Sequence, residues 1–252
     1  MLDPKTAVKA QFLEMLDDPD IRQRLADIAI ETILKDAFGQ GRHEHYNLDR
    51  IPSLEAAISS CEFVAAAMPR TLRFPNGDDF LKAMLAQAPL DGLIMECGVF
   101  SGHSISIIAG ERPAQTVFGF DSFEGLPEHW RPGFDAGTFR LPGLPQVPDN
   151  VRLIPGWFDR TLPAFLDQHP DSPVGFLHVD CDLYSSTQTV LTQLKDRFRP
   201  GTVIVFDEYL NYPGWQQHEH KAFGEFIASS RRAYEWIGLV PTGEQAAIRI
   251  LN

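Results

Sequence analysis

The spacing of hydrophobic positions along the chain changes near residue 92. Before this point, apolar residues recur every three or four positions, which predicts a helical arm over 5–37 and further helices over 53–68 and 77–87. Amphipathic helices outside a core must bury their apolar faces elsewhere. The sequence therefore predicts a helical N-terminal extension over 1–90, acting as a cap or as an oligomerisation element that makes the protein a homo-oligomer.

From residue 92 onward, short apolar runs alternate with helical segments, which is typical of βαβ units and a parallel sheet. The predicted strands are 93–98, 116–121, 151–155, 174–180 and 202–207. The intervening helices are expected to begin near Gly102, Asp159, Ser185 and Gln216. The last segment, from Tyr234, reads as two adjacent strands joined by a short turn. The expected fold class is α/β, with a mostly parallel sheet over 91–252 that ends in an antiparallel C-terminal hairpin.

An insert over 124–149 interrupts this alternation. It is rich in glycine and proline and carries Trp130, Phe134 and Phe139. Long segments without regular structure inside a compact domain are usually functional. We therefore expect this insert to be a lid over a ligand.

Composition excludes several classes of function. The 252-residue chain has a formal net charge of -12, which would repel a phosphate backbone, and no stripe of lysine and arginine offsets it, so nucleic acid is not expected as a partner. No apolar run is long enough for a bilayer, so no membrane association is expected. The three cysteines have no metal or redox spacing, and the first residues lack a signal-peptide pattern, which indicates a reducing, cytoplasmic location.

Acidic residues stand at the ends of three of the predicted strands. Glu96 closes the first, Asp180 and Asp182 follow the fourth, and Asp207 and Glu208 follow the fifth. Side chains at the carboxyl ends of parallel strands converge on one crevice. Five carboxyl groups in one pocket are unfavourable unless a cation, a proton or a cationic ligand compensates them. Helix capping is the alternative interpretation for Asp180 and Asp182.

Two further features point to a nucleoside-like ligand. The segment ECGVFSGHS, from Glu96 to Ser104, places Gly98 and Gly102 in a strand-to-helix turn where the backbone can approach a ligand closely. Asp121 ends the next strand, where an acid commonly binds ribose hydroxyls. The turn could equally serve packing alone, and Asp121 could be an N-cap.

In this order and spacing, ECGVFSGHS, FDSFEGLPE, VDCDLYSST and FDEY resemble the class I S-adenosylmethionine-dependent O-methyltransferases of the macrocin O-methyltransferase type, over roughly 92–252. The resemblance implies a Rossmann-like sheet and S-adenosylmethionine as cofactor. It places the turn from Glu96 through Gly98 to Ser104 by the methionine part of the cofactor, and Asp121 at the ribose. The remaining cofactor-binding residues that it implies are Ser122, Gly156, Trp157, Phe158 and Asp180.

The same resemblance implies a divalent cation, usually Mg²⁺, held by Asp180, Asp207 and Glu208. Hard oxygen ligands suit this ion. Glu208 departs from the aspartate that the family often has at this place. The candidate general base is Asp182, for which a role at the metal is an alternative, and His218 is a second candidate that could equally lie on the surface of a helix.

The expected function is O-methylation of a hydroxyl on a small-molecule acceptor, such as a sugar of a glycosylated natural product. Phenolic or catecholic acceptors are equally compatible with a chelated cation. A nucleotide-dependent oxidoreductase on a related sheet and a non-catalytic cofactor-binding module are the alternatives.

Overall fold

The computed structural model describes residues 19–20, 23–24, 27–28, 31–32, 48 and 50–252. The helical arm predicted over 5–37 lies largely outside these residues, although the described pairs within it are helical. The chain divides into two compact units, Met1–Glu55 and Ala56–Asn252. The second unit includes part of the extension predicted over 1–90. Whether that extension acts as a cap or in oligomerisation stays a prediction.

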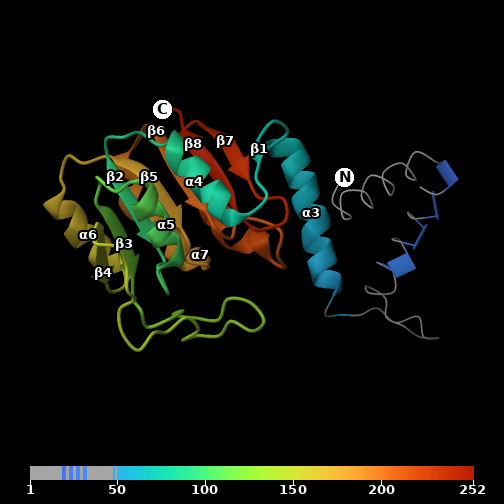
Figure 1. The fold of residues 1–252 in the computed structure, drawn as a ribbon, viewed down its shortest axis with the longest axis horizontal. Coiled ribbons are helices and arrows are strands. Elements are labelled where there is room, and N and C mark those ends of the chain that lie inside the picture. Colours follow the sequence, from blue (N-terminus) through green and yellow to red (C-terminus); the bar gives the residue numbers. More distant parts are fainter. Residues whose placement is uncertain (1–18, 21–22, 25–26, 29–30, 33–47, 49) are drawn as a thin grey trace, which may run out of the picture. The chain divides into compact units, whose positions relative to one another are not determined.

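A sheet of eight strands forms the centre of the second unit, in the order β1-β7-β8-β6-β5-β2-β3-β4 among the described residues (Figure 1). All neighbouring strands are parallel except that β8 runs antiparallel to β6 and β7. The strands are β1 (Leu72–Arg73), β2 (Leu93–Cys97), β3 (Val117–Asp121), β4 (Val151–Pro155), β5 (Val174–Val179), β6 (Phe198–Phe206), β7 (Tyr234–Leu239) and β8 (Ala246–Ile250). The chain reverses its direction of winding between β2 and β5, where ligands bind in open α/β sheets.

Helices cover both faces of the sheet because successive strand residues point to opposite faces. In β2, Ile94 packs with α4 (Gly77–Gln87) and α5 (His103–Glu111) in one core. Met95 packs in the other core with α6 (Phe158–Gln168), α7 (Tyr184–Leu194) and α8 (Glu219–Ser230). Strands buried on both faces are nearly continuous apolar runs, as the parallel sheet requires.

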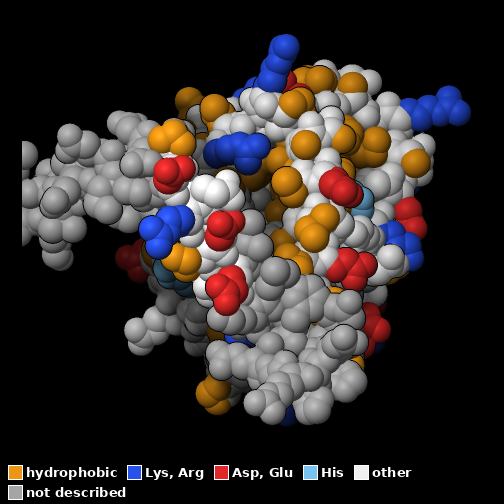
Figure 2. Space-filling model, turned by 90° about the vertical axis from the view of Figure 1, so that its right-hand side faces the viewer, with side chains coloured by type: hydrophobic (Ala, Val, Ile, Leu, Met, Phe, Trp, Pro, Cys, Tyr) orange, Lys and Arg blue, Asp and Glu red, His pale blue; other side chains and the backbone are white. Residues whose placement is uncertain are grey.

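Helix α3 (Ile51–Ala67) contributes to the second core through Ala56 and Val64, and Met68 follows directly after the helix in the same core. Its Ile58 is exposed. On the face drawn in Figure 2, hydrophobic side chains lie interspersed with acidic and basic ones over the described part of the chain. Among the described residues, no helix combines the length and hydrophobicity needed to cross a bilayer.

Most predicted elements are confirmed, and the C-terminal hairpin is antiparallel as expected. Three details differ. β1 has only two residues, too few to give a periodic signal. β6 begins at Phe198 rather than near 202, because the strand continues through Pro200 and Gly201 with a register shift against β5. α8 begins at Glu219 rather than near Gln216, after a 3₁₀ turn over Trp215–Gln217.

Candidate active site

A cavity of about 420 Å³ opens at the carboxyl edge of β2, β3, β5 and β6. It brings together eleven of the thirteen residues that the sequence singles out: Gly98, Ser104, Asp121, Ser122, Gly156, Trp157, Phe158, Asp180, Asp182, Asp207 and Glu208. Glu96 and His218 do not line it. Residues from α4 and from the insert 124–149 complete the walls.

Gly98 lines this cavity where the end of β2 approaches the residue after β5 closely. Its φ is 93°, and a Cβ at this position would lie 1.5 Å from the backbone oxygen of Asp180. A side chain is therefore excluded both by conformation and by the approach of the two strand ends. Gly102, with φ 86°, is the N-cap of α5, whose first N–H groups are free of side-chain caps. The glycines thus hold the β2–α5 turn against the end of β5.

Asp121 organises the turn that faces it. Its Oδ2 accepts hydrogen bonds from the backbone N–H groups of Val99 and Phe100, each at 2.8 Å. Its Oδ1 accepts from the N–H of Phe123 at 2.7 Å, which agrees with the capping interpretation. Ser122 accepts from the N–H of Glu124. The Asp121 carboxylate is therefore fixed at the cavity wall between the ends of β2 and β3.

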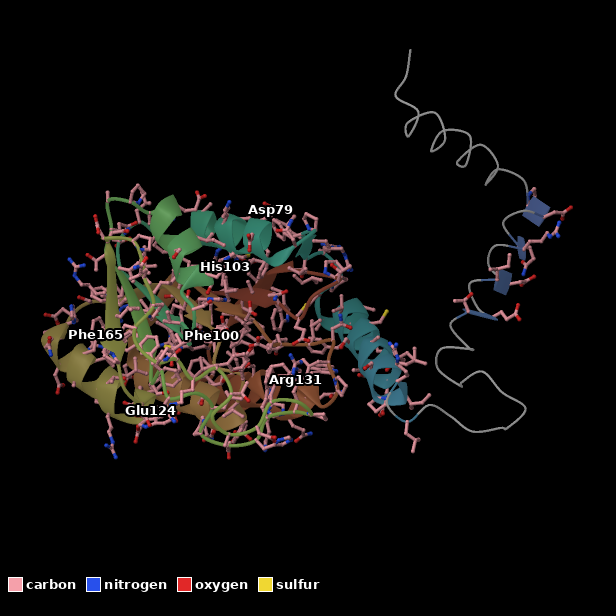
Figure 3. The ribbon with its side chains drawn as sticks, turned by 60° about the horizontal axis from the view of Figure 1, so that its bottom comes forward. Asp79, Phe100, His103, Glu124, Arg131 and Phe165 are labelled. Atoms are coloured by element: carbon pink, nitrogen blue, oxygen red, sulfur yellow. The ribbon has the colours of Figure 1, made fainter. Side chains whose placement is uncertain are left out.

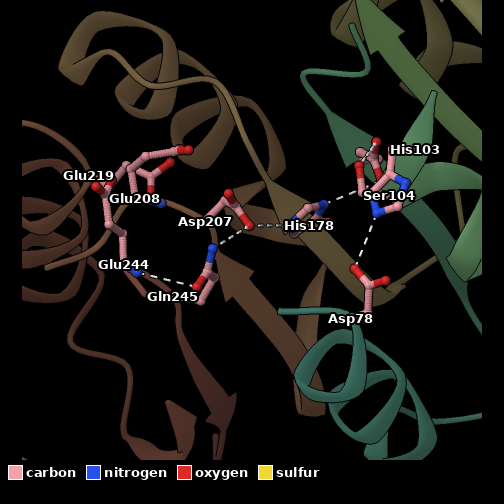
Figure 4. Close-up of polar contacts among 10 residues, drawn as sticks. Asp78, His103, Ser104, His178, Asp207, Glu208, Glu219, Glu244 and Gln245 are labelled. Carbon is pink, nitrogen blue, oxygen red and sulfur yellow. Dashed lines mark hydrogen bonds and ion pairs between the residues drawn. The ribbon is translucent and has the colours of Figure 1, made fainter. Parts of the chain in front are cut away.

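A chain of polar contacts includes four residues that line the cavity, Ser104, His178, Asp207 and Gln245 (Figure 4). Ser104 Oγ donates to Glu96 Oε1 at 3.0 Å, and His178 lies between Glu96 Oε2, 3.3 Å from Nδ1, and Asp207 Oδ1, 3.5 Å from Nε2. Gln245 Nε2 donates to Asp207 Oδ1 at 3.3 Å. Glu96 is fully buried, and its two carboxylate oxygens contact Ser104 of α5 and His178 of β5.

These contacts set the charge of the buried groups. Burial alone would lower the pKa of His178, but hydrogen bonds to Asp207 and Glu96 raise it well above its usual value. Burial would raise the pKa of Asp207, yet the hydrogen bond and charge of His178 lower it. Burial raises the pKa of Glu96. Asp207 is thus held as a carboxylate beside a cationic imidazole.

The acids after β5 and β6 form the predicted cluster. Ligand oxygens of Asp180, Asp207 and Glu208 all lie within 4.8 Å of one another. Burial, and then the charge of Asp207, raise the pKa of Asp180 and of Glu208 well above the usual range. Glu208 Oε2 is buried and has no hydrogen-bond partner within the described part of the chain. Three hard oxygen donors, one of them orphaned, fit a divalent cation such as Mg²⁺.

Asp182 lies beside this cluster in an unusual conformation. Its φ is 62°, which is uncommon for a residue other than glycine. Burial, only partly offset by the charge of Arg131, raises the pKa of Asp182 to about 7. Neither Asp180 nor Asp182 caps α7, whose N-cap is Leu183 without a side-chain bond. The capping interpretation of both residues is therefore wrong.

His218 is placed differently. It is the N-cap of α8, and its ring centroid lies 6.4 Å from that of Trp130 and 6.1 Å from that of Tyr212. Burial lowers its pKa, and Nδ1 has no hydrogen-bond partner among the described residues. A role for His218 as a base stays a prediction.

Glu219 was not singled out from the sequence, yet it is fully buried at the start of α8. Its Oε2 accepts a hydrogen bond from the backbone N–H of Glu208 at 3.1 Å, and its Oε1 has no partner among the residues that the structure describes. Burial raises the pKa of Glu219 well above the usual range. In the sequence HEHKAF nothing distinguishes this glutamate from a solvated first-turn residue.

The insert 124–149 contributes an aromatic wall. Trp130, Phe134 and Phe139 all line the cavity, and Trp130 is buried. Figure 3 shows Glu124 and Arg131 on this loop. Arg131 also lines the cavity, and it was not predicted because its sequence neighbourhood carries no motif.

The sequence matches known proteins over the same region. Residues 95–209 match a protein family described as a methyltransferase domain. The chain is 31% identical over 172 residues to a tetracenomycin 4'-O-methyltransferase of Streptomyces olivaceus, a match covering 58% of this chain and 63% of that protein. It is 29% identical over 179 residues to mycinamicin III 3''-O-methyltransferase of Micromonospora griseorubida, covering 58% and 68%. The chain therefore spans less than two thirds of the first relative's length.

Solved structures share the fold. The calicheamicin methyltransferase CalS11 aligns with a TM-score of 0.58 at 22% identity, covering 84% of this chain and 98% of that one. The O-methyltransferase NovP aligns with a TM-score of 0.52 at 23% identity, covering 69% and 79%. Residues 95–209 therefore match a methyltransferase domain, and the chain is similar in sequence to O-methyltransferases of natural products.

Proposed function

We propose that the protein transfers a methyl group from S-adenosylmethionine to a hydroxyl of a small-molecule acceptor, assisted by a divalent cation. The observation that carries this proposal is the shared cavity. The glycine turn and Asp121 form one part of it, and the carboxylates of Asp180, Asp207 and Glu208 form another. A methyl donor and a chelated hydroxyl could therefore meet in one enclosed space.

The residues on the cofactor side each have a defined task in this proposal. The backbone of the Gly98 turn lets the cofactor approach β2, and Asp121 accepts hydrogen bonds from its ribose hydroxyls. Ser122, Gly156, Trp157 and Phe158 flank the adenine. Asp121 already accepts three backbone N–H groups, so it would hold the ribose from a preorganised position.

The cation would be held by Asp180, Asp207 and Glu208. Bound there, Mg²⁺ would lower the pKa of an acceptor hydroxyl and fix its orientation. Asp207 is kept ionised by His178, whereas Asp180 and Glu208 would lose protons as the cation binds. Asp182 lines the same cavity and would take the hydroxyl proton as general base.

The balance of the reaction is simple. An electron pair of the acceptor oxygen forms the O–CH₃ bond, the S–CH₃ bond breaks, and its electron pair remains on sulfur, which leaves S-adenosylhomocysteine. The hydroxyl proton passes to Asp182. The carboxylates around the cavity favour binding of S-adenosylmethionine, because its sulfonium group is positively charged.

We propose a sugar of a glycosylated natural product as the acceptor class. The relatives from S. olivaceus and M. griseorubida are named as methyltransferases of a rhamnosyl-tetracenomycin and of a mycinamicin, which supports this class. The aromatic insert offers apolar surface on which a sugar ring can pack.

The test is methyl transfer itself. The protein is incubated with methyl-labelled S-adenosylmethionine and a panel of glycosides bearing vicinal hydroxyls, with Mg²⁺ or with a chelator. We expect labelled product with Mg²⁺, and loss of it with chelator and in Asp207→Ala. Full turnover in chelator would contradict the cation's role. Tight NADH binding without affinity for S-adenosylmethionine would favour the oxidoreductase alternative.

A further inference from the structure

The guanidinium group of Arg131, a residue of the insert 124–149, lies at the cavity and contacts Glu244 outside the insert. Arg131 Nη1 lies 3.0 Å from each carboxylate oxygen of Glu244, and the two side chains are 21% and 28% exposed. The guanidinium carbon also lies 3.9 Å from the ring centroid of Trp130, 4.7 Å from that of Tyr212 and 5.1 Å from that of Phe134. A guanidinium that is ion-paired and stacked on aromatic rings is held in one orientation.

Glu244 is hydrogen-bonded to the loop that follows Asp207 and Glu208, the proposed ligands of the metal ion. Its backbone oxygen accepts hydrogen bonds from the N–H groups of Tyr209, at 2.9 Å, and Leu210, at 3.1 Å, directly after Asp207 and Glu208. Its neighbour Gln245 donates to Asp207. The ion pair thus joins the insert to the turn before β8, which contacts the carboxylates of the cavity.

Few other polar side chains connect the insert to segments distant from it in the sequence. Among the described residues, one further side-chain hydrogen bond of this kind joins Glu128 to Ser185, and it is exposed. At the ends of the insert, Arg152 donates to the backbone oxygen of Asp149, and the N–H of Glu124 donates to Ser122. His129 and Asp135 contact each other within the insert. Arg131 and Trp130 line the cavity beside the acids, whereas Glu128 does not.

We propose that the Arg131–Glu244 pair is a clasp that fixes the insert over the acidic side of the cavity, which makes Arg131 a positioning residue for the acceptor. Only the statement that the positioned molecule is a methyl acceptor rests on the proposed function. The clasp itself is a property of the protein that can be measured without turnover. Removing either partner should increase the local opening of the insert, which carries Trp130 and Phe134.

The test is hydrogen exchange of the peptides that cover 124–149, followed by mass spectrometry on the full chain. We expect Arg131→Met and Glu244→Gln each to speed exchange of the insert about tenfold, as expected for loss of one charge-assisted contact. The double variant should exchange no faster than the faster single variant, because both remove the same link. Arg131→Lys keeps the cation and should give intermediate exchange.

Two substitutions serve as matched controls. Arg140→Met removes an exposed arginine of the same insert, and Glu128→Ala removes the exposed hydrogen bond to Ser185. Both should leave exchange of the insert within about twofold of wild type, as expected for exposed contacts. Peptides covering β5 report global unfolding and should be unchanged in every variant. Unchanged insert exchange in Arg131→Met, or multiplicative effects in the double variant, would overturn the clasp.

Kinetics with an identified acceptor provide the second readout. Arg131→Met should raise KM for the acceptor about tenfold while kcat changes less than about threefold, because the wall that orients the acceptor is loosened. A fall in kcat with unchanged KM would overturn the positioning role. An inactive wild type with a protected insert would instead refute methyl transfer and leave the clasp standing.

Discussion

Asp182 combines the properties that a general base requires at the edge of the acidic cluster. It lines the cavity, it is 7% exposed, and its pKa is raised to about 7 by burial. A carboxylate with a pKa near the working pH both accepts a proton and is ionised often enough to act. Its left-handed backbone is a local cost that a purely structural residue need not carry.

Replacement of Asp182 by asparagine should lower kcat by about 10²- to 10⁴-fold, the usual contribution of a general base. In wild type, kcat/KM should rise with pH and level off above about 7, because only the ionised carboxylate accepts the proton. Initial rates across pH 5.5–9 test both statements. A variant that keeps the same rising limb would show that another group titrates there.

Glu219 should act through Glu208. Its Oε2 holds the backbone N–H of Glu208, so Glu219→Ala should weaken Mg²⁺ binding about tenfold, in the range found for residues that support metal ligands. Glu219→Gln retains an acceptor oxygen and should lose less. Calorimetric titration of Mg²⁺ measures the affinity.

The matched control for Glu219 is Glu225→Gln, on the exposed side of the same helix, where the carboxylate contacts Tyr184. Its Mg²⁺ affinity should equal that of wild type. Equal affinity in Glu219→Ala as well would mean that Glu208 is held by the strand end alone.

The sequence predicts the strand-end acids because parallel strands carry their carboxyl ends to one edge. Asp180, Asp207 and Glu208 therefore come together as expected. Glu219 and Gln245 escape prediction because they reach the site through the placement of α8 and β8, which depends on long-range packing. Arg131 escapes for the same reason, since its partner Glu244 lies 113 positions away.

Among the elements, the turn between β2 and α5 depends most on one residue. At Gly98 an added Cβ would meet the backbone of Asp180, with φ 93°. Gly98→Ala should therefore lower the free energy of unfolding by more than about 3 kcal/mol. Urea denaturation followed by fluorescence measures this change.

Gly110 in α5 is the matched control for the turn. Nothing lies within 4 Å of a Cβ added there, and the position is exposed. Gly110→Ala should raise the free energy of unfolding by about 0.5 kcal/mol or more, because alanine is the better helix former. Similar effects at both glycines would contradict the close approach of the two strand ends.

Helices and strands could be predicted wherever the hydrophobic pattern extended over enough residues to show its period. α4, with Asn76 as N-cap, matches the range predicted for it, and β4 does as well. The sequence did not reveal that β8 inserts between β6 and β7, because strand order follows from long-range packing rather than from local periodicity. Strand order must be learned from the structure.

At the scale of the molecule, the net charge of -12 and the cluster of Asp180, Asp207 and Glu208 predict a stability that depends on cations. Mg²⁺ at about a hundred times its Kd should raise the free energy of unfolding by about 2.7 kcal/mol, as mass action requires for a ligand of the folded state. Urea denaturation with Mg²⁺ and with chelator tests this. Asp207→Ala should show no difference between the two conditions, and an equal gain in that variant would place the cation elsewhere.

The most direct measurement is calorimetric titration of S-adenosylmethionine into the purified protein, with and without Mg²⁺, repeated on Asp207→Ala. We predict one cofactor site in the wild type and a separate Mg²⁺ signal that the variant loses, since Asp207 is proposed to hold the cation and Asp121 the ribose. No binding of S-adenosylmethionine or S-adenosylhomocysteine under either condition would contradict the methyltransferase account.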